Sequence, residues 1–257
     1  MAFKTKKSLG QHFLTDSNII YKIVEAIGAN SDDRLIEIGP GTGALTSWLT
    51  KKYNDLHVIE VDERAIEVLK QQVPDVHIHQ KDVLKVDWSE ILSDKNDNFV
   101  VGNLPYYITS PILFTLLAQR SNFKEAILMM QKEVAQRLVA SPSSKDYGIL
   151  SVQTQLMSTP EILFDVSPNS FNPPPKVMSS VIRLTFDKPA LECSDEALKK
   201  VVRTAFNQRR KKLSNALKPV LDDYRPEGYN FDQRAENWTP DIYAELSAHL
   251  EKQNHLK

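Results

Sequence analysis

Short apolar runs alternate with amphipathic stretches through the first half of the chain. Residues 44–53 and a stretch that begins at Ala65 have apolar side chains at helical spacing, and Pro74 ends the second of them. Five apolar runs between such stretches are predicted β-strands: 34–39, 56–61, 76–79, 98–102 and 125–130. Strands that alternate with helices in this way form βαβ units. The pattern therefore predicts a parallel sheet with helices on both faces, a Rossmann-like α/β fold.

The pattern changes in the second half. Two β-rich segments, 162–166 and 177–186, have no long helix between them, which is typical of an antiparallel pair that closes one sheet edge. Beyond Lys188-Pro189 the periodicity is helical only, and Thr239-Pro240 has the residue types of a helix start. We therefore predict an α/β domain and a small C-terminal all-helical domain, residues 1–189 and 190–257.

The composition is that of an ordinary globular protein. Of its 257 residues 41% are hydrophobic and 25% are charged, and no apolar signal core follows the basic start of the chain. The longest apolar run, 126–130, is far too short to span a membrane. We expect a cytoplasmic monomer that makes no contact with membranes.

Few residues are candidates for a metal site. Cys193 is the only cysteine, which excludes an internal disulfide and any multi-cysteine zinc or iron–sulfur site. His77 and His79 alternate on a predicted strand and so share one face. No acid or cysteine stands at ligand spacing beside them in the sequence. We interpret this face as simply polar and predict no metal.

The net charge of -1 hides an uneven distribution. Residues 199–218 hold eight basic residues and no acid, and residues 1–15 hold three lysines and no acid. The rest of the chain carries 21 basic residues against all 33 acidic ones. Two basic segments on an acidic body suit a polyanionic partner, although a solvated helix face explains the run equally well on charge alone.

A glycine-rich loop separates the first predicted strand from its helix. In Glu37-Ile-Gly39-Pro-Gly41-Thr-Gly43, glycines let the backbone turn tightly and approach a ligand closely. Glu60 ends the second strand, where an acid can hold ribose hydroxyls. The spacing also fits the dinucleotide fingerprint, so an NAD-dependent dehydrogenase is a competing hypothesis.

Later residues argue against the dehydrogenase. Asp82 follows the third strand and can accept a hydrogen bond from an adenine amino group, and the fourth strand ends in Asn103-Leu104-Pro105-Tyr106. The chain has no Tyr-x-x-x-Lys pair of the short-chain dehydrogenase kind. The position of the tetrapeptide in register with the glycine loop, Glu60 and Asp82 favours a binding site over an ordinary turn with a proline and a buried tyrosine.

The tetrapeptide suits methylation of an exocyclic adenine amine. Such an amine is a poor nucleophile because its lone pair is delocalised into the ring. The Asn103 side-chain oxygen and the Leu104 carbonyl can each accept one N–H, which favours a pyramidal nitrogen. Pro105 fixes the turn, and Tyr106 can stack on a base that has left its helix.

Taken together, these residues resemble those of the small-subunit ribosomal RNA adenine dimethyltransferase family over nearly the whole chain. The matching segments are 7–14 at the N-terminus, 37–43, 58–60 and 80–82 for the cofactor, 102–107 for catalysis, and 171–179 for the target loop. The resemblance implies a class I S-adenosylmethionine-dependent fold. It also implies dimethylation of two adjacent adenosines in the 3′-terminal hairpin of small-subunit rRNA, during subunit assembly.

The resemblance also implies roles for single residues. Catalysis is assigned to Asn103, Leu104, Pro105 and Tyr106. Binding of S-adenosylmethionine is assigned to Gln11, His12, Leu14, Gly39, Gly41, Glu60, Asp82 and Asn103. Contact with the RNA is assigned to Tyr106 and Phe171 from these motifs, and to Arg209, Arg210, Lys211 and Lys212 from the basic run described above. His12 departs from the asparagine of many members, and a rigid loop with a core aromatic is the alternative interpretation of Phe171.

Two rival functions remain beside the dehydrogenase. The first is an enzyme of the same class that acts on large-subunit rRNA, against which the helical C-terminus and the Phe171 motif argue. The second is a non-catalytic ribosome assembly factor that kept the fold, since a fold alone does not give a function. The retention of Glu60, Asp82 and residues 103–106 argues against lost catalysis.

Overall fold

The computed structural model describes residues 11–222 and 224–256, which form two compact units. Unit 1 comprises residues 1–135 and 161–186, and unit 2 comprises residues 136–160 and 187–257. The second junction lies close to the predicted domain boundary at residues 189 and 190. Residues 136–160, however, belong to unit 2 by packing. Because compactness alone does not define a domain, the predicted two-domain division stays a prediction.

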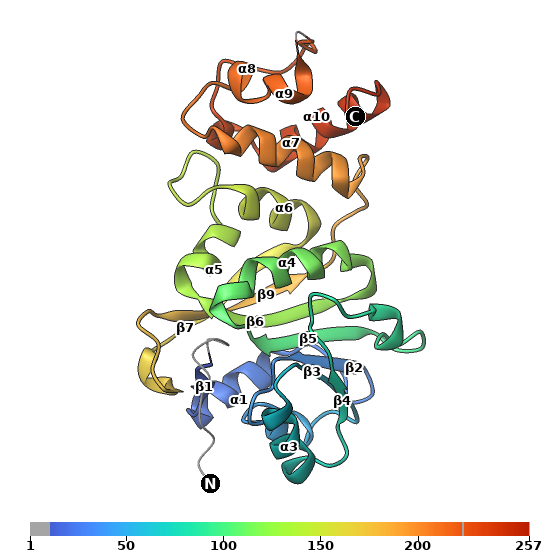
Figure 1. Cartoon of the computed structure of the whole chain (residues 1–257), viewed down its shortest axis with the longest axis vertical. Coiled ribbons are helices and arrows are strands. Elements are labelled where there is room, and N and C mark those ends of the chain that lie inside the picture. Colours follow the sequence, from blue (N-terminus) through green and yellow to red (C-terminus); the bar gives the residue numbers. More distant parts are fainter. Residues whose placement is uncertain (1–10, 223, 257) are drawn as a thin grey trace. The chain divides into compact units, whose positions relative to one another are not determined.

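A seven-stranded sheet forms the centre of the fold, with the strand order β4-β3-β2-β5-β6-β9-β7 (Figure 1). The strands are β2 (Arg34–Ile38), β3 (Asp55–Glu60), β4 (His77–Gln80), β5 (Asn98–Asn103), β6 (Glu125–Gln131), β7 (Thr159–Val166) and β9 (Ser179–Thr185). The first five are parallel, and β9 runs antiparallel to β6. The predicted parallel sheet with a late β-rich edge is confirmed.

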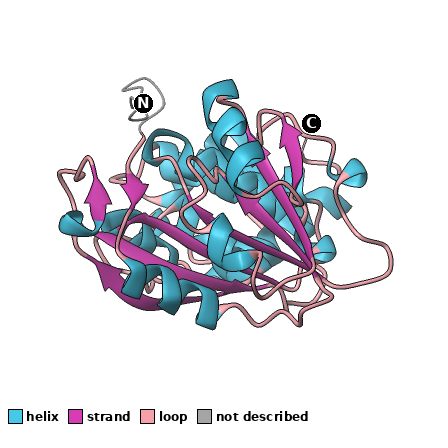
Figure 2. Ribbon diagram, turned by 90° about the horizontal axis from the view of Figure 1, so that it is seen from below, coloured by secondary structure: helices cyan, strands magenta, loops and turns pink. Residues whose placement is uncertain are grey.

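Each face of the sheet buries alternate residues of the same strands. Leu35, Val58 and Val101 belong to a hydrophobic cluster that also takes in the apolar side of α1 (Ser17–Ala26). The residues between them, such as Ile36 and Val100, are just as buried on the opposite face. Figure 2 shows helices on either side of the strands. Burial on both faces explains why these strands read as continuous apolar runs.

The helices of unit 1 precede, connect or follow the parallel strands. They are α1, α2 (Thr46–Leu49), α3 (Glu63–Gln72), α4 (Thr109–Ala118) and the first part of α5 (Lys132–Leu138). Turns at residues 41–45 and 50–52 flank α2, so the predicted helix over 44–53 was too long. The glycine loop continues into these turns instead of into a regular helix. Two further short strands, β1 (Phe13–Leu14) and β8 (Phe171–Asn172), pair antiparallel with each other.

Unit 2 is helical, as the periodicity predicts. Its helices are α6 (Ile149–Met157), α7 (Asp195–Asn207), α8 (Leu213–Ala216), α9 (Lys218–Leu221) and α10 (Pro240–Lys252). Ser194 caps α7 by accepting from the Ala197 amide, and Thr239 caps α10. Among the described residues, no helix is long and apolar enough to cross a membrane.

Candidate active site

A cavity of about 340 Å³ opens at the carboxyl ends of β2, β3 and β5 in unit 1. This is the edge where open α/β sheets bind their ligands. Ten of the predicted catalytic or cofactor-binding residues line it: Gln11, His12, Gly39, Gly41, Glu60, Asp82, Asn103, Leu104, Pro105 and Tyr106. The structure thus brings together residues from five separate segments of the sequence.

The glycine loop forms one wall of the cavity. Gly39 and Gly41 have φ angles of 67° and 55°, a region that residues with a side chain rarely adopt. A Cβ atom on Gly41 would lie 2.6 Å from the Phe13 ring. Glycine is therefore required at position 41 for two reasons, its backbone conformation and the closeness of the N-terminal segment that covers the loop.

Three backbone amides fix the Glu60 carboxylate. Its Oε1 accepts from the amides of Val61 and Asp62, both at 2.8 Å, and its Oε2 accepts from the Gly41 amide at 3.1 Å. Glu60 is only 7% exposed. The side chain thus ties the glycine loop to the end of β3 and holds a charged acceptor at the cavity wall.

Asp62 also contributes, although sequence reasoning missed it. It accepts from Gln11 Nε2 at 3.0 Å and from Arg64 at 2.6 Å, and its side chain caps α3. The hydrogen bonds from Arg64 lower the pKa of the Asp62 carboxyl to about 2. This carboxylate anchors the N-terminal segment over the cavity. The sequence signal for this role is the Asp62-x-Arg64 pattern, which follows the acid Glu60 at the end of β3.

Asp82 lies beside an apolar part of the cavity. Its Oδ1 accepts from the Leu84 amide at 3.0 Å, so the carboxylate is held at the turn that follows β4. Val61, Val83 and Leu84 line the same cavity, and Val61 is 57% exposed. Exposed valine is costly unless something covers it. A flat heterocycle whose amino group reaches Asp82 fits this combination of apolar walls and one acceptor.

The orientation of the Asn103 amide follows from one hydrogen bond. Asn103 Nδ2 donates to the His12 carbonyl oxygen at 3.0 Å. A carbonyl can only accept, so the amide nitrogen must face His12 and the side-chain oxygen points away from it. The Leu104 amide donates to the Met129 carbonyl at 2.9 Å and fixes the next peptide. The site thus presents Asn103 as an acceptor.

Tyr106 is held from two directions. Its hydroxyl lies 2.6 Å from Ser179 Oγ on β9, and its ring stacks on His12 with centroids 5.7 Å apart and an interplanar angle of 26°. His12 Nδ1 donates to the Pro173 carbonyl at 2.8 Å, which fixes the imidazole in this position. His12 therefore has a clear structural part despite departing from the usual asparagine. The His12 ring stacks on the Tyr106 ring, and the His12 backbone carbonyl orients the Asn103 amide.

Glu37 lies buried beneath the glycine loop. It accepts from Thr46 Oγ1 at 2.7 Å and is 2% exposed. Burial raises the pKa of the Glu37 carboxyl to about 8, and the nearby Glu60 charge acts in the same direction. At neutral pH this carboxyl is largely protonated, so only one of the two acids beneath the loop is charged.

Two predicted site residues of unit 1 do not line the cavity. Leu14 and Phe171 are 5% and 4% exposed and face each other across the β1–β8 pair, within the hydrophobic cluster. A ring buried in this way has no face open to a base. The alternative interpretation of Phe171 as a core aromatic matches the structure, and its base-stacking role stays a prediction that this packing does not favour.

The basic residues at 209–212 lie in unit 2, on a turn between α7 and α8. Arg209 pairs with Glu236 at 2.7 Å and donates to the carbonyls of Ser144 and Lys145. Lys212 pairs with Asp232 at 2.9 Å. Arg210 and Lys211 are exposed. Lys212 is exposed as well, whereas the half-buried Arg209 has a packing role. The three N-terminal lysines lie outside the described residues.

Comparison with known proteins gives this site its context. The family model described as ribosomal RNA adenine dimethylase matches residues 2–243. The chain belongs to this family. The resemblance and the fold predicted from the sequence are thereby confirmed, and an NAD-dependent dehydrogenase is excluded.

Relatives in this family cover almost the whole chain. A Salinibacter ruber protein named ribosomal RNA small subunit methyltransferase A is 45% identical over 97% of this chain and 86% of its own length. Porphyromonas gingivalis and Neisseria meningitidis proteins of the same name are 42% and 43% identical and cover 98% and 96% of this chain, and 100% and 96% of their own lengths.

Solved structures give the same result. A dimethyladenosine transferase from Plasmodium falciparum has a TM-score of 0.79 and 27% identity, and the match covers 95% of this chain and 98% of that one. The 23S rRNA methyltransferase ErmE has a TM-score of 0.66 and 25% identity, with 93% and 99% covered.

Proposed function

We propose that this protein transfers methyl groups from S-adenosylmethionine to N6 of two adjacent adenosines in the 3′-terminal hairpin loop of small-subunit rRNA. The observation that carries the proposal is the Asn103 amide, which His12 turns so that an acceptor faces a cavity already holding two carboxylates. Membership of the ribosomal RNA adenine dimethylase family supports the reaction class.

The residues of the cavity fit S-adenosylmethionine. Glu60 offers a fixed charged acceptor suited to a ribose diol, and Asp82 offers one suited to an adenine amine beside the apolar Val61 and Val83. The close approach permitted by Gly39 and Gly41 suits the amino-acid part of the cofactor. When bound, the cofactor supplies an electrophilic sulfonium methyl.

The chain itself contributes binding, orientation and polarisation. Asn103 Oδ1 and the Leu104 carbonyl accept the two N–H bonds of the target amine, which draws its lone pair out of conjugation. Tyr106, supported by His12 and Ser179, positions the base. Protonated Glu37 keeps negative charge beneath the loop low. Because alignment and polarisation lower the barrier, the site needs no strong base.

The small subunit is the better supported substrate. The relatives at 42–45% identity are named for the small subunit, whereas the 23S rRNA enzyme ErmE is 25% identical. The exposed Arg210 and Lys211 suit contact with rRNA phosphates. We further propose that the protein acts as a cytoplasmic monomer on the assembling small subunit.

The test is incubation with small subunits that lack the hairpin methylation and with labelled S-adenosylmethionine, followed by mapping of the modified nucleotides. We expect two adjacent dimethylated adenosines in the 3′-terminal hairpin. Large subunits and the Asn103→Ala variant serve as controls. Label found in large-subunit rRNA would support the rival substrate. Cofactor binding without any label would support a non-catalytic assembly factor.

A further inference from the structure

A cluster of three histidines and an aspartate lies at the opposite end of the sheet from the cofactor cavity. Asp55 and His57 come from β3, and His77 and His79 come from β4. His57 and His77 are direct neighbours in the parallel register. Asp55 begins the strand that Glu60 ends, so Asp55 lies roughly 16 Å and His57 roughly 10 Å from Glu60 along β3 at the usual rise per residue. None of the four lines the cofactor cavity.

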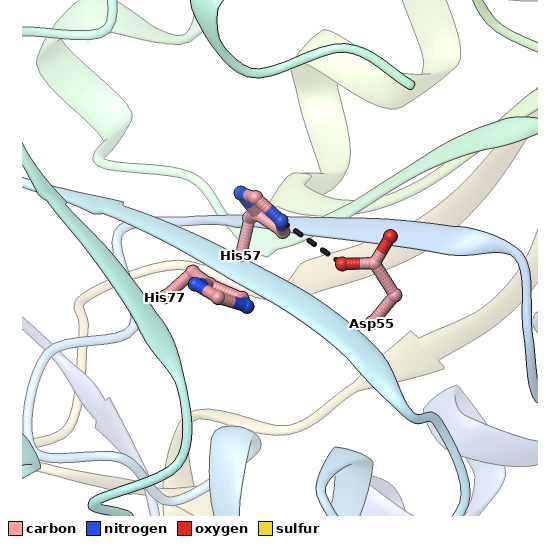
Figure 3. A group of neighbouring side chains, drawn as sticks. All are labelled: Asp55, His57 and His77. Atoms are coloured by element: carbon pink, nitrogen blue, oxygen red, sulfur yellow. Dashed lines mark hydrogen bonds and ion pairs between the residues drawn. The ribbon is translucent and has the colours of Figure 1, made fainter. Parts of the chain in front are cut away.

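The side chains of the cluster converge. Asp55, His57 and His77 each offer one ligand atom, and these atoms all lie within 4.8 Å of one another (Figure 3). His57 Nε2 is 3.0 Å from Asp55 Oδ1, and its ring stacks on that of His77 with centroids 4.6 Å apart. Ligand atoms around a tetrahedral metal lie roughly 3.3 Å apart, given bonds of about 2.0 Å. His57 Nε2 and Asp55 Oδ1 are already near that separation, and His77 is the exposed member of the group.

We propose that Asp55, His57 and His77 form a binding site for a divalent transition-metal ion of the zinc type. One carboxylate and two imidazoles are a ligand set that zinc accepts, with water in the fourth position. His77 is exposed, which leaves a path for entry and room for that water. The sequence alone predicts no metal here because Asp55 is remote from His77 along the chain.

His79 supports the site as a positioning residue. Its Nε2 lies 2.8 Å from His57 Nδ1. A metal bound at His57 Nε2 requires the ring proton of His57 to lie on Nδ1. His79 Nε2 is placed to accept a hydrogen bond from that N–H group.

Arg34 sets an upper limit on the affinity. Its guanidinium pairs with the second carboxylate oxygen of Asp55 at 2.9 Å, and it also donates to the Ile91 carbonyl. Lys81 is nearby but is paired with Glu90. The Arg34 charge repels a divalent ion, so we expect weaker binding than at a cysteine-rich structural site. A bound ion would link the edge strand β4 to β3.

The test measures metal binding by the full chain after treatment with a chelator. Competition with a chromophoric chelator gives the zinc affinity and stoichiometry, and the visible spectrum of a cobalt complex reports tetrahedral nitrogen and oxygen ligation. We expect one site per chain, cobalt bands of tetrahedral intensity, and a rise in thermal midpoint on addition of zinc.

The variants are His77→Ala, Asp55→Asn and His79→Ala, with the exposed His255→Ala of unit 2 as the matched control. His77→Ala and Asp55→Asn should weaken zinc binding at least about tenfold, His79→Ala should weaken it about tenfold through the His57 tautomer, and the control should leave it unchanged. Since His77 is exposed, its loss should not impair folding, which the thermal midpoint without metal checks. Absence of stoichiometric binding, or equal affinities for wild type and His77→Ala, overturns the proposal.

Discussion

Glu60 receives all three of its described hydrogen bonds from backbone amides, at Gly41, Val61 and Asp62. Its position is therefore decided by the chain path of two loops, and not by packing of its own side chain. The same holds for Asn103, whose amide is turned by a backbone carbonyl. At the scale of single residues, main-chain groups fix the side chains of the site, and no sequence motif predicts these main-chain contacts.

The Glu60→Gln variant should bind S-adenosylmethionine about 1 to 3 kcal/mol more weakly than wild type, because one charge-assisted acceptor is lost. The amide keeps one oxygen for the loop amides, so the fold should persist. Calorimetry measures the affinity, with the exposed neighbour Glu63→Gln as the control. Equal affinities for wild type and Glu60→Gln would remove Glu60 from the cofactor site.

Asn103→Ala and Tyr106→Ala should lower the single-turnover rate of methyl transfer by about 100-fold, a scale typical for loss of a polarising group. Cofactor affinity should change far less, because their partner is the target base. Tyr106→Phe loses only the contact with Ser179 and should retain most activity. Asn122→Ala, at the exposed end of a short 3-10 helix, is the control. A near-normal rate in either alanine variant would exclude that residue from catalysis.

At the scale of elements, β2 and α2 meet at the Glu37–Thr46 hydrogen bond, beneath the glycine loop. The sequence predicts a long helix after this loop, whereas the structure has a four-residue helix between turns. Three glycines with positive φ angles form tight turns at the point where a regular helix would otherwise begin. Similarly, the basic run of unit 2 is interrupted by a turn at residues 208–212. Arg209 and Lys212 form ion pairs there, and Arg210, Lys211 and Lys212 are exposed.

Glu37 should make the stability of the protein without cofactor depend on pH. The pKa of about 8 for its carboxyl in the folded state lies above the ordinary value of 4.5. The folded state therefore binds the extra proton between these values, and stability is lost as pH rises from 4.5 through 8, by at most about 5 kcal/mol. Glu37→Gln, which keeps an acceptor for Thr46, should flatten this loss. Urea unfolding at pH 5, 6.5 and 8 measures it. Parallel profiles for Glu37→Gln and wild type would contradict the raised pKa.

The double variant Arg210→Gln/Lys211→Gln should bind small subunits more weakly and with less salt dependence. Each lost phosphate contact should flatten the slope of log affinity against log salt by roughly 0.7 to 0.9. Arg209 is left intact because its pairing with Glu236 is part of unit 2. Lys70→Gln/Lys95→Gln removes the same charge from exposed positions of unit 1. Identical slopes for the two double variants would mean that the basic turn is only a solvated surface.

At the scale of the whole molecule, the sequence by itself determined the sheet, its parallel order, the helical C-terminal part and ten residues of the cavity. It could do so because strand periodicity and carboxyl-edge geometry are local consequences of residue order, whereas Gln11 and His12 came from the resemblance to the family. Only the tertiary structure decided the rest. Whether Phe171 faces a base or the core, whether Arg209 faces RNA or Glu236, and whether Asp55 meets His77 all depend on segments distant in sequence. Side-chain partners across strands and loops follow from register and packing, which local patterns do not encode.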